Sequence, residues 1–243
     1  IFRILKNAFE QENGFKNLKQ ILIRPILKDS TNLHSPGNFR PIALLSHLFK
    51  LYESILHRRL VTHLEGYENA AGGDEPKPLL CEEANGFRPG RGCTDNIFLL
   101  RELALDHKFC KKRKKPLLMA FLDIRKAFDR VSRPILWHRL HQLGATGRFW
   151  RVLRNLYHNF QGSVKTGPGE GTKPFQIGTG VVQGSRLGPT LFNVFFNELI
   201  VQIKKKFTGA TFSFGTSLPV LAYADDLVLF SNSAVEFRFR PRK

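Results

Sequence analysis

The chain has 243 residues, of which 42% are hydrophobic and 12% aromatic, so it is long and apolar enough to fold around a sizeable core. Lys and Arg number 38 against 20 Asp and Glu, which gives a formal net charge of +18. A surplus of this size favours a polyanionic partner such as nucleic acid, and the alternative is a soluble protein that is merely basic.

The three cysteines, Cys81, Cys93 and Cys110, have no metal-ligand spacing. An odd count of this kind is typical of a reducing, intracellular compartment, the nucleus or cytoplasm, and not of a disulfide framework. No apolar run approaches the ~20 residues that cross a bilayer, so we expect no membrane partner.

In the first part of the chain, residues 18–25 predict a strand that Pro25 stops. Residues 46–60 have the three-four apolar spacing of an amphipathic helix. After a loop rich in Gly and Pro over residues 66–78, a second helix is expected to end near residue 109. Thr94 or Asp95 would be its N-cap.

The basic run Lys111–Lys115 predicts a solvated loop, with nuclear import or phosphate contact as the alternative. The apolar run Leu117–Leu122 that follows predicts a strand at the centre of a sheet, buried on both faces. Helical spacing resumes over residues 135–157, with a break at Gly144 and Gly147.

Residues 162–180 predict short strands and turns, and residues 191–203 predict a helix. Apolar segments 220–223 and 227–230 then predict two strands joined by a turn. Helices and strands follow one another without a regular βαβ alternation, which predicts an α+β fold.

The last of these turns carries two adjacent carboxylates, Asp225 and Asp226. Two like charges at a hairpin tip repel each other, and a divalent cation would relieve that repulsion. The alternative is that Asp simply tolerates tight-turn geometry. A metal site needs a further carboxylate, and Asp123 follows the apolar run at 117–122, although Asp123 alone could also be a helix N-cap.

Five ordered segments resemble the reverse transcriptases of LINE-type, non-LTR retrotransposons. Ala120–Asp129 is similar to the first catalytic motif, Gly180–Pro189 with Leu191–Asn193 to the second palm motif, and Tyr223–Asp226 to the catalytic box. Asn38–Ile42 and Gly86–Arg91 resemble the fingers motifs. The resemblance covers roughly residues 15–230 in the order of the family.

The resemblance implies a right-hand polymerase with an antiparallel palm sheet. It predicts fingers over residues 1–116 and a partial palm over 117–236, with an unrelated basic tail at 237–243 and no thumb. The implied activity is RNA-directed DNA synthesis from an RNA template, a DNA primer and dNTPs. One alternative is a catalytically inactive retroelement remnant that only binds nucleic acid, and another is an RNA-dependent RNA polymerase palm.

By the same resemblance, three carboxylates are catalytic and bind Mg²⁺ or Mn²⁺: Asp123, Asp225 and Asp226. Phe128 is implied to lie under the incoming sugar and to exclude a 2′-hydroxyl, although an aromatic there is as often core. The remaining nucleotide-binding residues implied are Gln183, Gly184, Arg40 and Arg88. Without the resemblance, Gln183-Gly184 is only a turn signal and the two arginines are ordinary surface residues.

Overall fold

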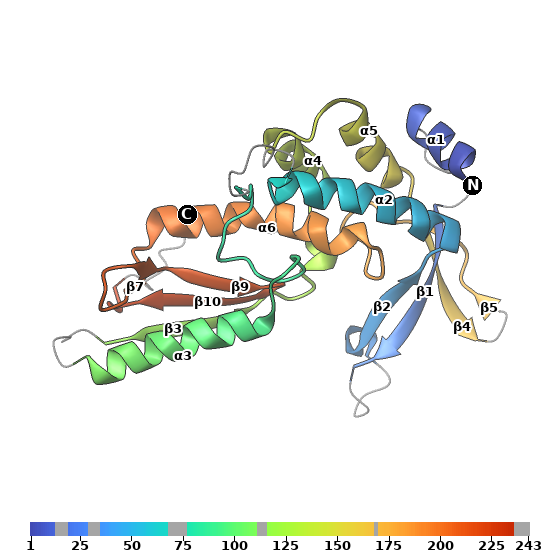
Figure 1. The fold of residues 1–243 in the computed structure, drawn as a ribbon. Helices are drawn as coiled ribbons and strands as arrows, with labels where there is room; N and C mark the ends of the chain where they lie inside the picture. Colours follow the sequence, from blue (N-terminus) through green and yellow to red (C-terminus); the bar gives the residue numbers. More distant parts are fainter. Residues whose placement is uncertain (13–18, 29–34, 68–76, 111–115, 168–169, 236–243) are drawn as a thin grey trace, which may run out of the picture. The chain divides into compact units, whose positions relative to one another are not determined.

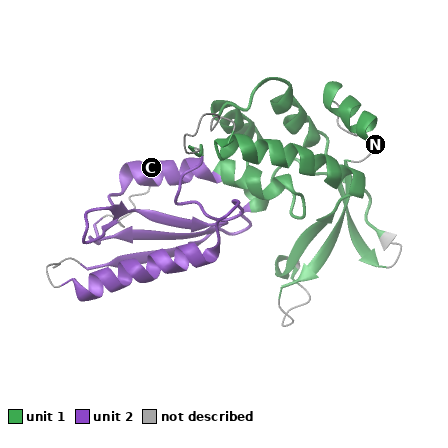
Figure 2. Cartoon of the chain, viewed as in Figure 1, with its two compact units in different colours: residues 1–79, 128–195 green, residues 80–127, 196–243 purple. Residues whose placement is uncertain are grey.

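The computed structural model describes residues 1–12, 19–28, 35–67, 77–110, 116–167 and 170–235. The chain forms two compact units, each built from discontinuous segments (Figure 2). Unit 1 contains residues 1–79 and 128–195, and unit 2 contains residues 80–127 and 196–243. Both units combine helices with mainly antiparallel sheets, so the predicted α+β class is confirmed.

The predicted boundaries between fingers, palm and tail stay predictions. The basic run at 111–115 and the tail at 237–243 lie outside the described residues. Within the described residues, no helix is both long enough and apolar enough to cross a membrane.

Unit 1 contains a sheet of five strands in which β1 (Gln20–Leu27) lies between β2 (Phe39–Leu44) and β4 (Gln161–Gly167) (Figure 1). β1 pairs antiparallel with β2 and parallel with β4. The short strands β5 (Glu170–Gly171) and β6 (Phe175–Gln176) both pair with β4, as the turn-rich composition predicts.

Strand β1 does not stop at Pro25, which corrects the prediction. It continues to Leu27, and Pro25 lies opposite Pro41 of β2. The pairing with β4 ends at the Ile23–Val164 pair, so none of the described strands on that side requires an N–H from Pro25. Proline is tolerated where the ladder does not use its missing donor.

The helices of unit 1 are α1 (Phe2–Glu10), α2 (His47–Leu64), α4 (Arg133–Gln142), α5 (Gly147–Leu156) and the first half of α6 (Leu187–Lys206). Ser46 caps α2 by accepting a hydrogen bond from the Phe49 N–H at 3.2 Å. The predicted break is confirmed, because Gly144 and Gly147 have φ of 85° and 63°. Large apolar side chains of these helices are completely buried: Phe49, Leu56, Leu60, Leu136 and Leu153.

In unit 2, β10 (Asp226–Ser231) lies between β3 (Leu118–Asp123) and β9 (Val220–Tyr223), all antiparallel (Figure 1). The helix α3 (Cys93–Phe109) packs on this sheet. A short hairpin of β7 (Ala210–Thr211) and β8 (Ser217–Leu218) completes the unit. Side chains from α3, β9, β10 and this hairpin form one buried core cluster: Leu103, Ala210, Phe212, Leu221 and Phe230.

Two predictions for unit 2 are wrong. Among the described strands β3 lies at the edge of its sheet and not at a buried centre, with Phe121 69% and Met119 41% exposed. The N-cap of α3 is Gly92, and Asp95 lies at the third helical position, where its carboxylate accepts the Gly92 N–H at 2.7 Å. Asp95 therefore satisfies an amide at the helix start from inside the helix.

Candidate active site

Asp225 lies in the turn of the hairpin that joins β9 to β10. Tyr223 and Asp226 are the last paired residues, so Ala224 and Asp225 form a two-residue connection. Ala224 has a φ of 56°, which is in the left-handed region. A non-glycine residue there is strained by about 1–2 kcal/mol, and such strain persists only where the surrounding structure imposes it.

Asp123 and Asp226 lie directly opposite each other on β3 and β10. Residues opposite in an antiparallel pair place their side chains on the same face, with Cβ atoms about 4.5–5.5 Å apart. Both side chains are exposed, and Asp225 is half-buried. The three carboxylates predicted to be catalytic therefore belong to one end of one small sheet.

The arrangement is compatible with a divalent cation, but it is not a closed cage. Within the described part of the chain, no three His, Cys, Asp or Glu side chains converge closely enough to form a metal cluster. Mg²⁺ commonly takes one or two protein carboxylates and completes its octahedron with waters and substrate phosphates. An open pair of hard oxygen donors at an exposed strand end fits that requirement.

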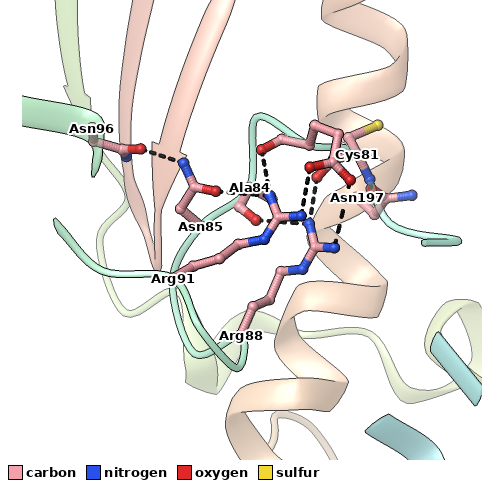
Figure 3. Close-up of polar contacts among 8 residues, drawn as sticks. Cys81, Ala84, Asn85, Arg88, Arg91, Asn96 and Asn197 are labelled. Atoms are coloured by element: carbon pink, nitrogen blue, oxygen red, sulfur yellow. Dashed lines mark hydrogen bonds and ion pairs between the residues drawn. The ribbon is translucent and has the colours of Figure 1, made fainter. Parts of the chain in front are cut away.

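Arg88, predicted to contact nucleotide, is a structural residue in unit 2. It is 5% exposed, and its guanidinium donates to the carbonyl oxygens of Cys81 at 2.9 Å and Ala84 at 3.1 Å (Figure 3). A buried guanidinium held by backbone carbonyls is not presented to a triphosphate. The geometry therefore does not support the predicted nucleotide contact for Arg88.

Gln183 and Gly184 lie in unit 1, against β2. The Ala43 N–H donates to the Gln183 carbonyl at 2.8 Å. A Cβ at position 184 would lie 2.6 Å from the Ala43 carbonyl oxygen, and Gly184 has a φ of 105°. Only glycine fits this approach, so the fold itself requires Gly184.

Phe128 begins the short 3₁₀ turn Phe128–Arg130, and its ring is stacked on Phe192 with centroids 4.7 Å apart. The Val181 N–H donates to the Phe128 carbonyl at 2.9 Å, so the Phe128 turn and the segment before Gln183 are joined. Arg40 is exposed on β2, paired opposite Ile26. Phe128, Gln183, Gly184 and Arg40 belong to unit 1, and the three carboxylates belong to unit 2.

Two residues that the sequence did not single out organise the segment around Gln183. Arg133 is 7% exposed and donates to the carbonyls of Gly180 at 3.0 Å and Ile177 at 2.6 Å. Burial lowers the pKa of the Arg133 guanidinium. Its further acceptors are the carbonyls of Tyr157 and Thr179.

Glu53 of α2 is the second such residue. It is 2% exposed and accepts hydrogen bonds from the Ser185 hydroxyl at 2.6 Å and the Arg186 N–H at 3.3 Å. Burial raises the pKa of Glu53, and these two hydrogen bonds oppose the rise. The signal available in the sequence was an acidic residue within the apolar stripe formed by Phe49, Leu56 and Leu60.

The family described as reverse transcriptase (RNA-dependent DNA polymerase) matches residues 26–238. The Pol polyprotein from the type-1 retrotransposable element R2 of Popillia japonica is 30% identical over 205 residues, which is 84% of this chain and 26% of that protein. The RNA-directed DNA polymerase from the mobile element jockey of Drosophila melanogaster is 28% identical over 222 residues, which is 90% of this chain and 22% of that protein.

Among solved structures, apo telomerase from Candida tropicalis, truncated from its C-terminal domain, has a similar fold. The TM-score is 0.62 at 13% identity, over 91% of this chain and 45% of that chain. The resemblance to non-LTR retrotransposon enzymes is therefore confirmed by the family match and by relatives that align over most of this chain. The chain belongs to the reverse transcriptase family.

Proposed function

We propose that the chain forms the fingers and the palm core of an RNA-directed DNA polymerase that extends a DNA primer on an RNA template with dNTPs. Asp123, Asp225 and Asp226 are the catalytic carboxylates, with Asp123 and Asp225 the firmer metal ligands. The observation that carries the proposal is the opposition of Asp123 and Asp226 at the strand end that also bears Asp225.

The expected ions are two divalent cations, Mg²⁺ or Mn²⁺. Asp123 and Asp226 offer hard carboxylate oxygens at an exposed strand end, Asp225 is half-buried in the adjoining turn, and waters and substrate phosphates would complete the coordination. When bound, such ions would lower the charge barrier to attack on a phosphate. The contribution of the chain is to hold the carboxylates on a rigid, hydrogen-bonded hairpin, so that little reorganisation is needed during the reaction.

In the reaction, the primer 3′-hydroxyl loses its proton as its oxygen bonds to the α-phosphorus of the dNTP. The bond from that phosphorus to the bridging oxygen breaks, and pyrophosphate leaves. Phe128 would lie under the incoming sugar and exclude a 2′-hydroxyl. Gln183 and Gly184 would lie beside the nucleotide and template, and exposed Arg40 would contact phosphate.

The net charge of +18 supports a nucleic-acid substrate, because each phosphate that Lys or Arg neutralises releases counterions. The family match favours a reverse transcriptase over the RNA polymerase alternative. Primer extension separates an active polymerase from an inactive remnant that only binds nucleic acid.

The test is primer extension by this chain, with a matching thumb supplied, on an RNA template with Mg²⁺ or Mn²⁺. Asp225→Asn should abolish extension while leaving template affinity unchanged or slightly raised, because one negative charge is removed. Glu10→Gln, the same charge change at an exposed carboxylate of α1 outside every motif of the resemblance, should retain extension. Extension by Asp225→Asn would remove the catalytic assignment, and absence of extension by the unmodified chain that still binds RNA would favour the inactive remnant.

A further inference from the structure

The segment that begins at Cys81 runs beside β9, on the side opposite β10. Ala84 forms a parallel bridge with Ala222 of β9. The Ala222 N–H donates to the Glu83 carbonyl at 2.9 Å, and the Asn85 N–H donates to the Ala222 carbonyl at 3.0 Å. Ala222 lies two residues before the strained Ala224, so backbone hydrogen bonds hold the hairpin on both sides just before its turn.

Two buried asparagines reinforce this pairing (Figure 3). Asn96 of α3 donates its amide to the Ala222 carbonyl at 3.2 Å, and Asn85 donates its amide to the Asn96 side-chain oxygen. Arg91 donates to the Asn85 side-chain oxygen at 3.1 Å, which fixes the orientation of that amide. Asn85 is 5% and Asn96 8% exposed, so a broken link would leave a buried polar group unsatisfied.

Gly86 lies directly against the turn. A Cβ on Gly86 would be 2.2 Å from the Ala224 backbone nitrogen and 3.0 Å from its Cα. Phe87, the next residue, has a φ of 61°, and Ala224 has a φ of 56°. Both segments that meet at this contact therefore contain a strained residue. Such strain persists only where the surrounding structure holds the backbone in place.

We propose that Asn85, Gly86, Arg91 and Asn96 form a clamp that positions the turn bearing Asp225, and through it Asp226. The clamp residues are positioning residues, since none of them is assigned a contact with substrate or metal. The inference rests on the proposed function for the role of the two carboxylates. It assigns a use to the Gly86–Arg91 segment, which the sequence placed among the fingers motifs and which belongs to the same compact unit as the hairpin.

Three variants of the full chain test the clamp. Gly86→Ala adds one methyl group where the Ala224 backbone leaves no space. Asn96→Ala removes one donor to the Ala222 carbonyl and leaves the Asn85 N–H in place. Because this change is milder, it still tests the clamp if Gly86→Ala does not fold. Gly92→Ala is the matched control, since it lies in the same segment with its nearest neighbour at 3.9 Å and a φ of −137°.

The first measurement is amide hydrogen exchange over residues 220–231. Gly86→Ala and Asn96→Ala should speed exchange at the turn about tenfold relative to Gly92→Ala and the unmodified chain.

The second measurement is Mn²⁺ binding, followed by the electron paramagnetic resonance of free Mn²⁺. The affinity for Mn²⁺ should fall about tenfold in the same two variants, as it does when residues that orient metal ligands are replaced in other proteins. A loss of folded protein alone would lower the amount of Mn²⁺ bound without changing the affinity.

Unchanged exchange at the turn in both variants would overturn the clamp. So would faster exchange with unchanged Mn²⁺ affinity, provided that Asp225→Asn does weaken Mn²⁺ binding. If Asp225→Asn binds Mn²⁺ as the unmodified chain does, the metal assignment of the proposed function fails, and the exchange rates alone decide whether the clamp holds the turn.

Discussion

Asp123 and Asp226 face each other across β3 and β10, with both side chains exposed on the same face. Like charges directly opposite in an antiparallel pair destabilise it, by up to about 1 kcal/mol. A divalent cation bound at this strand end would relieve that repulsion.

Asp226→Asn should raise the thermal unfolding midpoint in the absence of divalent cations, because it removes the repulsion with Asp123. Added Mg²⁺ should then raise the midpoint of the unmodified chain more than that of the variant, since a ligand stabilises only the state that binds it. Thermal unfolding followed by circular dichroism measures both effects. Asp129→Asn, at an exposed aspartate outside this pair, should reproduce neither.

Phe128→Ala should increase the use of ribonucleotides relative to deoxynucleotides, because the ring that would exclude a 2′-hydroxyl is removed. The measurement is the ratio of kcat/KM for a dNTP and the matching NTP in primer extension. The ratio is insensitive to the folded fraction, which matters because the variant also removes the ring stacked on Phe192. An unchanged ratio would leave Phe128 with a packing role alone.

The hairpin was predictable because its pattern is local. Two apolar segments flanking adjacent aspartates specify two strands and a turn, and the apolar run before Asp123 specifies the third strand. The position of β3 at the sheet edge was not predictable, since a short apolar run looks the same at an edge and at a centre. Which strands pair with it is decided by residues far away in sequence.

Arg88 and Glu53 show that the sequence pattern also does not predict the partners of buried polar side chains. Arg88 is held by carbonyls of its own loop, and a basic residue within a family motif gives no sign of that burial. Glu53 gave a usable sign, an acid within an apolar helical stripe, but its partner Ser185 is 132 residues away. Buried polar networks depend on tertiary pairing, which periodicity alone does not encode.

Glu53 should make stability depend on pH. Burial raises the pKa of Glu53 above the ordinary value of 4.5, so the folded state holds this proton more tightly than the unfolded chain. The resulting stabilisation is fully present below pH 4.5 and is lost as the pH rises through the raised folded pKa. The free energy of unfolding, measured with urea, should therefore increase for Glu53→Gln relative to the unmodified chain as the pH rises to neutral. Parallel pH profiles for the two proteins would contradict the assignment.

Arg40 and Arg88 provide a matched pair for RNA binding, because one guanidinium is exposed on β2 and the other is 5% exposed within unit 2. RNA affinity of the chain should fall steeply with salt, since counterion release dominates binding by so basic a protein. Arg40→Ala should reduce the slope of log affinity against log salt by about one, the loss expected for one phosphate contact.

Arg88→Ala should leave that slope unchanged and instead lower the thermal unfolding midpoint, because it removes donors to the Cys81 and Ala84 carbonyls. Fluorescence anisotropy of a labelled RNA across a salt series measures the slopes. A reduced slope for Arg88→Ala with an unchanged midpoint would return Arg88 to the nucleic-acid interface.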